Sequence, residues 1–216
     1  MDAQTIHAYN SAAAARCELY RLILPTELLL FAPGFFHPGQ PTADIGCGSG
    51  RDVAWLNEHG FPSIGYDASP AMLAEARTAY PGLDVRAAAL PKLAGVPDGA
   101  YANVLCSVVL MHLPRKNLGG AVRSLARILQ PGGRLLLSYR SSAAATEREA
   151  DGRLFTAIPP GELTLHLDAA GLQVLEERQQ ADAYRPGVHW FIFLAEKHPF
   201  LGAASEEAVN SAPSRH

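Results

Sequence analysis

The chain has 216 residues, of which 48% are hydrophobic and 18% charged, and its formal net charge is −3. This length fits one domain, or one domain with a cap, and can bury a core without disulfides or metals. The slightly acidic balance gives no electrostatic footprint for a nucleic-acid backbone. The most apolar stretch, residues 22–36, is interrupted by Pro25, Glu27 and Pro33, and it is too short to span a membrane. We therefore expect neither a nucleic-acid partner nor membrane insertion.

The N-terminus lacks the basic and apolar pattern of a secretory signal. The three cysteines, Cys17, Cys47 and Cys106, are widely spaced and form no CxxC pair. An odd number at such spacing favours a reducing compartment over a disulfide framework or a zinc cluster. We expect a cytoplasmic protein that holds no metal.

The hydrophobic pattern changes near residue 41. Residues 2–36 are expected to be helical, and beyond them short apolar runs alternate with amphipathic stretches, as in a βαβ architecture. We predict a helical cap at 1–36, a main domain at 37–198 and a flexible tail at 199–216. Residues 141–158, small and polar, are expected to form a loop or lid. The predicted strands are 41–45, 61–66, 83–87, 101–109, 134–139, 172–177 and 189–196.

Turn and cap residues mark the helices between these strands. Ser69 is the expected N-cap of one helix, with Pro70 in its first position. Further helices are expected at 51–59, along the apolar stripe that begins at Leu118, and along the stripe that Gly171 closes.

The informative motif lies between the first strand and its helix, in the run Asp44-Ile45-Gly46-Cys47-Gly48-Ser49-Gly50-Arg51. Three alternate glycines allow a tight turn that brings a ligand against bare backbone N–H groups. The helix that follows offers a positive dipole end to a carboxylate or phosphate.

Asp44 narrows the choice of ligand. It lies at the carboxyl end of the first predicted strand, just ahead of the glycines, where its carboxylate would repel a pyrophosphate and attract an ammonium or sulfonium group. S-adenosylmethionine carries such positive charge together with a carboxylate. Asp67, at the end of the second predicted strand, could accept hydrogen bonds from both hydroxyls of a ribose. A nicotinamide-dinucleotide enzyme is the rival, but its fingerprint needs a glycine where this chain has Arg51.

The motif resembles motif I of the class I S-adenosylmethionine-dependent methyltransferases, and Tyr66-Asp67 resembles the acidic position that follows it. Leu129-Gln130-Pro131-Gly132-Gly133 is similar to the turn before the fifth strand of that family, and residues 105–113 resemble its fourth strand and exit. The resemblance covers residues 41–139 in the expected order. It implies a Rossmann-like, doubly wound seven-stranded sheet in the order 3-2-1-4-5-7-6, with the last strand antiparallel.

The resemblance also implies residue roles. The cofactor would be S-adenosyl-L-methionine and its product S-adenosyl-L-homocysteine, bound at the sheet's carboxyl edge. The glycines would lie under the methionine part, Asp44 near its amino group and Asp67 on the ribose. Family members often carry an acidic residue for the adenine amine, but this chain has alanines and a leucine there. The implied cofactor-binding residues are Asp44, Gly46, Cys47, Gly48, Gly50, Arg51, Asp67, Ala68, Ala88, Leu90 and Cys106.

Residues at the same edge are candidates for the acceptor side. His112, just past the fourth strand, is the candidate catalytic residue, as a base or an orienting group; a helix-entry histidine is the equal alternative. Tyr9 could fold over the site from the N-terminal helix. The further candidates for substrate contacts, with ordinary packing as the alternative, are Tyr139, Arg140, Tyr184, Arg185, His189 and Trp190.

These observations predict methyl transfer to oxygen, nitrogen or sulfur of a small-molecule acceptor by a monomer or homodimer. No proline-aromatic motif of the amino-methylating nucleic-acid enzymes follows the fourth strand. Two alternatives remain open. Residues 108–113 also resemble the exit of tellurite-resistance methyltransferases, which act on chalcogen oxyanions such as tellurite or selenite. A non-catalytic module that binds S-adenosylmethionine or scaffolds a partner is the other.

Overall fold

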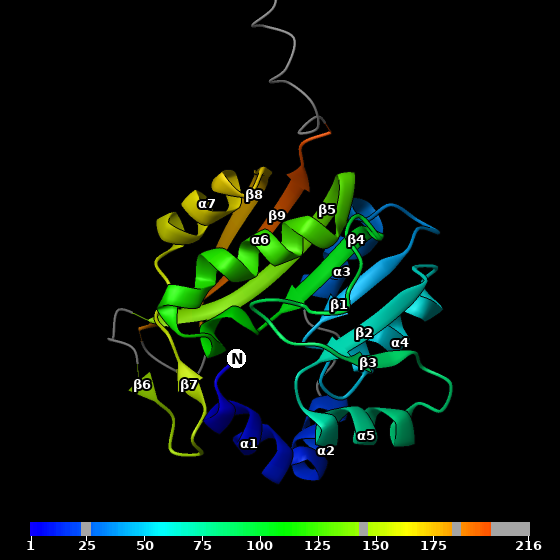
Figure 1. Cartoon of the computed structure of the whole chain (residues 1–216), viewed down its shortest axis with the longest axis vertical. Helices are drawn as coiled ribbons and strands as arrows, with labels where there is room; N and C mark the ends of the chain where they lie inside the picture. The colour runs from blue at the N-terminus through cyan, green and yellow to red at the C-terminus, as the bar shows by residue number, and fades with distance from the viewer. Residues whose placement is uncertain (23–26, 143–146, 183–186, 200–216) are drawn as a thin grey trace, which may run out of the picture.

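A seven-stranded sheet forms the centre of the computed structural model, which describes residues 1–22, 27–142, 147–182 and 187–199. The strand order is β3-β2-β1-β4-β5-β9-β8 (Figure 1). The first five strands run parallel, and β9 is antiparallel to both of its neighbours. Numbered within this sheet alone, the order is 3-2-1-4-5-7-6, which confirms the prediction. The strands are β1 (Thr42–Ile45), β2 (Ser63–Asp67), β3 (Val85–Ala87), β4 (Tyr101–Ser107), β5 (Leu129–Ser142), β8 (Leu172–Ala181) and β9 (Val188–Lys197).

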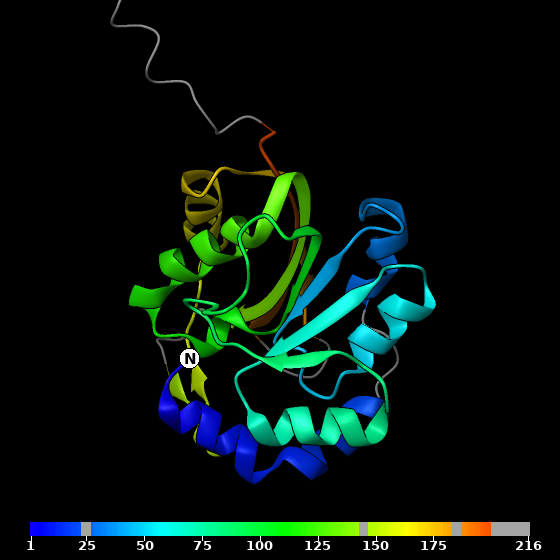
Figure 2. The same ribbon diagram turned by 45° about the vertical axis from the view of Figure 1, so that its right-hand side comes forward.

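Helices cover both faces of the sheet (Figures 1 and 2). α3 (Glu27–Phe35) and α4 (Arg51–Glu58) lie on one face, and α6 (Leu118–Ile128) and α7 (Pro160–Ala169) on the other. α5 (Pro70–Ala79) begins as predicted, because the Ser69 hydroxyl accepts the Met72 N–H at 3.1 Å and Pro70 is the first helical residue. This two-faced burial explains why every residue of β4 except Ser107 is buried.

The core divides between the two faces. Beneath α6 and α7, the sheet buries a large aliphatic cluster that includes Val104, Leu125 and Leu137. Beneath α3 and α4, Leu29 and Phe36 pack with residues of β4, β5 and β9. α3 is therefore part of the layer that covers the sheet. None of the helices within the described residues combines the length and apolar character needed to cross a bilayer.

α1 (Ala3–Ser11) and α2 (Ala13–Leu22) have a different position. They lie across the lower edge of the sheet in Figure 1, against α5 and beside the small hairpin of β6 (Glu147–Arg148) and β7 (Leu154–Phe155). This hairpin belongs to the stretch that was expected to be a loop. The predicted tail begins at 199, and its residues from 200 onward lie outside the described part of the chain. The division at residue 36 stays a prediction.

Candidate functional site

The carboxyl ends of three parallel strands open into one cavity of about 370 Å³. The turn after β1, the end of β2 and the segment after β4 supply its floor, while α1 and α2 cover it. This is the edge at which open parallel α/β sheets bind their ligands. The lining residues are Met1, Ile6, Tyr9, Tyr20, Gly46, Cys47, Gly48, Ser49, Arg51, Asp52, Asp67, Ser69, Met72, Ser107, Val108, Val109, His112 and Trp190.

The glycine turn needs its glycines. Gly46, Gly48 and Gly50 have φ values of 85°, 51° and 76°, a left-handed region that side chains with a Cβ rarely adopt. A Cβ at Gly46 would also collide with a methyl group of Val109. The segment after β4 and the turn after β1 can therefore approach each other only because this position is glycine.

Three backbone N–H groups of the turn are not bare, contrary to expectation. Those of Gly46 and Cys47 donate to the Tyr66 carbonyl at 2.7 and 3.0 Å. The Gly48 N–H donates to Asp67 at 2.9 Å. The left-handed conformation turns these donors toward β2, and this ties the two strand ends together. A ligand would therefore meet the open side of the turn rather than a row of donors.

Asp44 lies beneath the turn and is only 2% exposed. Its Oδ2 has no hydrogen-bond partner among the described residues. Burial, together with the neighbouring Asp52 and Asp67, raises the pKa of this carboxyl well above its usual value. Asp44 does not itself line the cavity, but Asp52 and Asp67 do. The carboxylates make the floor of the cavity favourable for a cation.

Asp67 is held at the cavity by backbone donors. Its Oδ2 accepts the Gly48 N–H at 2.9 Å and its Oδ1 accepts the Ser69 N–H at 2.8 Å. A carboxylate has about four lone-pair sites, and the backbone N–H groups of Ser69, Gly48 and Ala68 bond to Asp67, so the carboxylate can still accept a ligand hydroxyl. Burial raises the pKa of Asp67, and its backbone hydrogen bonds oppose that shift. At the other side, Arg51 donates to Asp52 at 2.7 Å.

His112 and Tyr9 meet at the cavity wall. His112 lies in a short 3-10 turn (Leu110–His112) after β4, and its Nδ1 is 2.7 Å from the Leu154 carbonyl. A carbonyl only accepts, so Nδ1 carries the proton. Burial lowers the pKa of His112 below its usual value, and the neutral ring leaves Nε2 as an acceptor. The Tyr9 hydroxyl, 3.0 Å away, donates to it.

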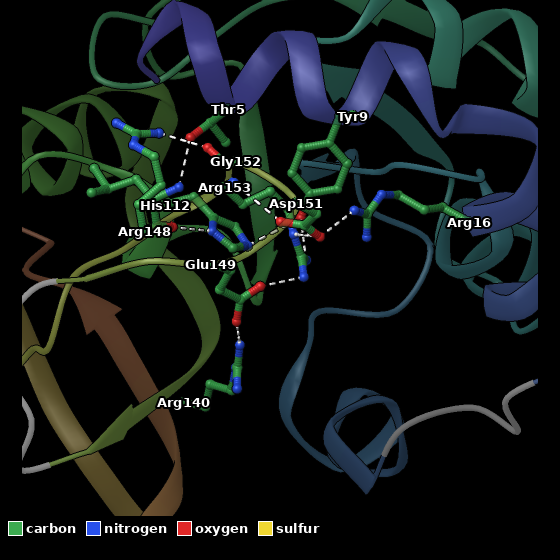
Figure 3. A network of polar contacts seen from close by, with 11 residues as sticks. Thr5, Tyr9, Arg16, His112, Arg140, Arg148, Glu149, Asp151, Gly152 and Arg153 are labelled. Atoms are coloured by element: carbon green, nitrogen blue, oxygen red, sulfur yellow. Dashed lines mark hydrogen bonds and ion pairs between the residues drawn. The ribbon is translucent and has the colours of Figure 1, made fainter.

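A chain of ion pairs lies behind this contact (Figure 3). Arg16 of α2 pairs with Asp151 at 2.6 Å, and Asp151 pairs with Arg153 at 2.9 Å. Arg153 also pairs with Glu149, which pairs with Arg140 of β5. The chain joins α2, the β6–β7 hairpin and the sheet, and so it holds the cover over the cavity.

The structure brings eight of the sequence-predicted residues to the cavity and leaves others away from it. Those that line it are Tyr9, Gly46, Cys47, Gly48, Arg51, Asp67, His112 and Trp190. Asp44 lies beneath the turn, and Gly50 ends the turn at the start of α4 without lining the cavity. Tyr184 and Arg185 lie outside the described residues. Residues that do not line it are Ala68, Ala88, Leu90, Cys106, Tyr139, Arg140 and His189.

Tyr139 corrects the prediction most clearly. It is fully buried, and its ring stacks on Phe191 and Phe193 at centroid distances of 5.2 and 6.1 Å. It shares a face of β5 with Leu135 and Leu137, because alternate residues of a strand point the same way. Tyr139 therefore belongs to the core. Cys106 is also fully buried within β4, and the following Ser107 and Val108 reach the cavity instead.

Arg140 and His189 also lie away from the cavity, although both were predicted to contact the substrate. The Arg140 guanidinium pairs with Glu149 and stacks over Phe155 at 4.3 Å. His189 lies opposite Ser141 in the sheet. Trp190 does line the cavity, and its indole N–H donates to Asp182 at 2.9 Å.

Sequence reasoning missed several lining residues. Ser107 ends β4 as Asp67 ends β2, so the ends of the parallel strands predict the position of Ser107 to Val109. Ile6 and Tyr9 are three residues apart on α1 and share a helical face. No local signal marks Tyr20 or Met72, whose place depends on how α2 and α5 pack.

Comparison with known proteins agrees with this geometry. Residues 43–137 match a family model described as a methyltransferase domain. O-methyltransferase resE of Aspergillus sclerotiorum is 31% identical over 166 residues, which are 68% of this chain and 60% of that protein. The chain spans about half the length of the curated relatives it matches.

Solved structures share the fold at lower identity. The 1,6-didemethyltoxoflavin-N1-methyltransferase of Burkholderia thailandensis, with bound 1,6-didemethyltoxoflavin and S-adenosylhomocysteine, has a TM-score of 0.70 and 20% identity, covering 91% of this chain and 88% of that one. The cyclase SpnF has a TM-score of 0.64 and 20% identity, covering 80% of each chain. The fold is that of a Rossmann-like methyltransferase. Together with the domain match, the fold identifies residues 43–137 as a methyltransferase domain similar to those of the class I S-adenosylmethionine-dependent methyltransferases.

Proposed function

We propose that the protein transfers a methyl group from S-adenosylmethionine to a hydroxyl oxygen of a small-molecule acceptor. The observation that carries the proposal is the pairing of a buried, neutral His112 with Tyr9 at the wall of a cavity whose floor is acidic. The fold alone does not carry it, because SpnF shares the fold and is named as a cyclase.

The residues present fit this cofactor. Asp67 would accept hydrogen bonds from the ribose hydroxyls, and the glycine turn would lie against the methionine part. The fit is tested by the buried Oδ2 of Asp44, which has no hydrogen-bond partner among the described residues and could take one from the cofactor. A nearby ammonium group would favour the ionised form of Asp44, whereas a pyrophosphate would be repelled by Asp52 and Asp67 and would favour the neutral form of Asp44. When bound, S-adenosylmethionine supplies an electrophilic methyl carbon.

The chain's own contribution is to align the acceptor and take up its proton. A productive approach needs the attacking oxygen within about 3–3.5 Å of the methyl carbon, with water excluded. α1 and α2 cover the cavity and so exclude water. The Tyr9 hydroxyl donates to Nε2 of His112, so an acceptor proton would reach the imidazole through Tyr9. The Leu154 carbonyl keeps the other ring proton on Nδ1.

Oxygen is the acceptor atom that the site favours. A hydroxyl must lose its proton on methylation, which gives the Tyr9–His112 pair a function. An oxyanion such as tellurite carries no such requirement and would need a cation. Among the described residues, Arg140 and Arg153 near this wall are already paired with Glu149. The relative resE is named as an O-methyltransferase. The chalcogen alternative is therefore the weaker one.

The cellular context is part of the same proposal. Cys17, Cys47 and Cys106 are all buried free thiols, as suits a reducing compartment. We propose a cytoplasmic enzyme with a small-molecule substrate, acting as a monomer or homodimer and without a bound metal.

Turnover with a panel of acceptors tests the proposal. The purified chain would be mixed with S-adenosylmethionine and with phenols, alcohols, amines, thiols, selenite or tellurite, and S-adenosylhomocysteine release would be measured. Release that depends on a hydroxylated acceptor supports the proposal. Release of S-adenosylhomocysteine only with selenite or tellurite would favour the alternative of a chalcogen methyltransferase. Cofactor binding without release for any acceptor would favour the scaffold reading.

A further inference from the structure

Arg153 occupies a particular place beside the Tyr9–His112 pair. It stands immediately before β7, at the end of the tight loop 149–153 that joins the two strands of the hairpin. The loop closes on itself, because the Glu149 N–H donates to the Arg153 carbonyl and the Gly152 N–H to the Glu149 carbonyl, each at 2.8 Å. The side chain of Arg153 is only 17% exposed. The hairpin therefore presents Arg153 from a fixed backbone.

Two carboxylates and an aromatic ring hold the guanidinium. Arg153 pairs with Asp151 at 2.9 Å and with Glu149, and its guanidinium carbon lies 5.6 Å from the centre of the Tyr9 ring. Its Nη1 donates to the Tyr9 hydroxyl oxygen at 3.5 Å. Figure 3 shows these side chains converging on the space between α1 and the hairpin.

The hydrogen bonds that run from Arg153 through Tyr9 and His112 to the Leu154 carbonyl can be donated in only one direction. A guanidinium has donors and no acceptor, so the Tyr9 proton must point away from Arg153 and toward Nε2 of His112. A carbonyl has acceptors and no donor, so the His112 ring must donate from Nδ1 to Leu154. Arg153 and Leu154 are consecutive residues. Two neighbouring residues of the hairpin therefore fix both ends of this series of hydrogen bonds.

We propose that Arg153 is a positioning residue for methyl transfer, which orients the Tyr9 hydroxyl so that a neutral His112 receives its proton through Nε2. The inference rests on the proposed function, because that function gives the Tyr9–His112 pair its role. Arg153 acts through Tyr9 and His112 and does not line the cavity.

The charges around His112 support the same role. The groups that bear on its imidazole are Tyr9 of α1, Glu149 and Arg153 of the hairpin loop, and Arg140 of β5. Burial is the largest cause of its lowered pKa; Arg153 and Arg140 lower it further, whereas Glu149 and the Leu154 carbonyl raise it. Removing the Arg153 charge would leave Glu149 less compensated, and the imidazole would be protonated more easily.

Nitrogen NMR of the histidine rings tests the proposal without any methyl transfer. In the full-length ¹⁵N-histidine-labelled protein, we expect the neutral His112 ring to carry its proton on Nδ1 and to titrate below about pH 6.5. Arg153→Gln should raise the midpoint by about one pH unit, whereas the Leu154 carbonyl should keep the proton of the neutral ring on Nδ1, and Arg153→Lys should reverse most of the shift in midpoint. Because the readout needs no acceptor, it separates a failure of this inference from a failure of the proposed function.

Arg148→Gln is the matched control. Arg148 lies on the same hairpin and pairs with Asp2 at 3.2 Å, but none of its hydrogen bonds within the described residues reaches Tyr9 or His112. This variant should leave the titration unchanged. Equal titrations in the Arg148→Gln and Arg153→Gln variants would overturn the proposal. Should Arg153→Gln fail to fold, the unmodified protein still decides: a neutral His112 ring protonated on Nε2 contradicts the inferred direction of the chain.

Discussion

The hydroxyl oxygen of Tyr9 lies 3.0 Å from Nε2 of His112, although 103 positions separate the two residues in the chain. Tyr9 belongs to α1 and His112 follows β4, so the contact closes the N-terminal helix over the carboxyl edge of the sheet. The helix is therefore part of the candidate site, and its removal would expose the imidazole to water.

Replacing His112 tests the proposed proton acceptor. In His112→Asn, the amide N–H can still approach the Leu154 carbonyl, but the acceptor for the Tyr9 proton is lost. We expect kcat for a hydroxyl acceptor to fall by about 10²- to 10⁴-fold, while S-adenosylhomocysteine affinity stays within a few-fold. Steady-state kinetics and calorimetry measure the two effects.

The pH profile gives the same prediction a second check. The imidazole must be neutral to take a proton, and its pKa is lowered. The acidic limb of kcat should therefore lie below about pH 6.5. His59→Asn, which changes a histidine stacked on Trp55, should retain full activity. A His112→Asn variant as active as this control would show that His112 is not the base.

Asp44→Asn should stabilise the protein that has no ligand. The folded-state pKa of Asp44 is raised, so the native state holds its proton more tightly than the unfolded chain. The associated stability is complete below the unfolded pKa, near 3.8, and is lost as the pH rises through the folded value. An asparagine is neutral throughout. The variant's advantage in free energy of unfolding should grow from pH 4 to reach about 1 kcal/mol or more at pH 7.

The same substitution should weaken cofactor binding, since a neutral amide cannot attract an ammonium group. Urea denaturation at several pH values and calorimetric titration with S-adenosylmethionine measure both properties. Asp98→Asn, whose parent carboxylate is 75% exposed, is the control. A stabilised Asp44→Asn protein that binds S-adenosylmethionine as tightly as its parent would show that the charge of Asp44 does not attract the cofactor.

Tyr139→Phe should leave activity unchanged. Its hydroxyl is buried and finds no hydrogen-bond partner in the described part of the chain, so its loss removes an unsatisfied polar group. We expect a stability equal to the parent's or higher by about 1 kcal/mol, with unaltered KM for the acceptor. A raised KM would mean that the Tyr139 hydroxyl reaches the substrate after all.

Gly46→Ala should lose both stability and cofactor binding. Gly46 has a φ of 85°, and an added Cβ would collide with Val109. The matched control is Gly60→Ala, because Gly60 has a φ of 82° and open space around its Cβ position. The backbone strain of about 1–3 kcal/mol is common to both, so the additional loss in Gly46→Ala reports the close approach at the turn. Equal losses of stability and affinity in both variants would contradict this.

Much of the fold was predictable because its signals are local. Alternating apolar and amphipathic segments predicted the βαβ pattern, and the Ser69-Pro70 start of α5 was confirmed to the residue. The strand order came from the family resemblance. The β6–β7 hairpin was missed because its strands are two residues long and carry no alternating pattern.

The residues of the site could be predicted where they lie at the ends of parallel strands. The predictions were wrong where the direction of a side chain decided whether the residue lines the cavity. Asp67 ends β2 and His112 follows β4, so topology alone places them at one edge. Tyr139 also ends near that edge, but strand alternation assigns it to the core with Leu137. The contact between Arg153 and Tyr9 joins residues 144 positions apart, and no local pattern could indicate it.

Cofactor binding to the unmodified chain tests the central claim most directly. We would titrate S-adenosylmethionine, S-adenosylhomocysteine and NAD separately into the protein in a calorimeter. The acidic floor beneath the glycine turn predicts one-to-one binding of both adenosyl compounds and no binding of the dinucleotide. Binding of NAD in preference to S-adenosylmethionine, or no heat with either adenosyl compound, would contradict the account.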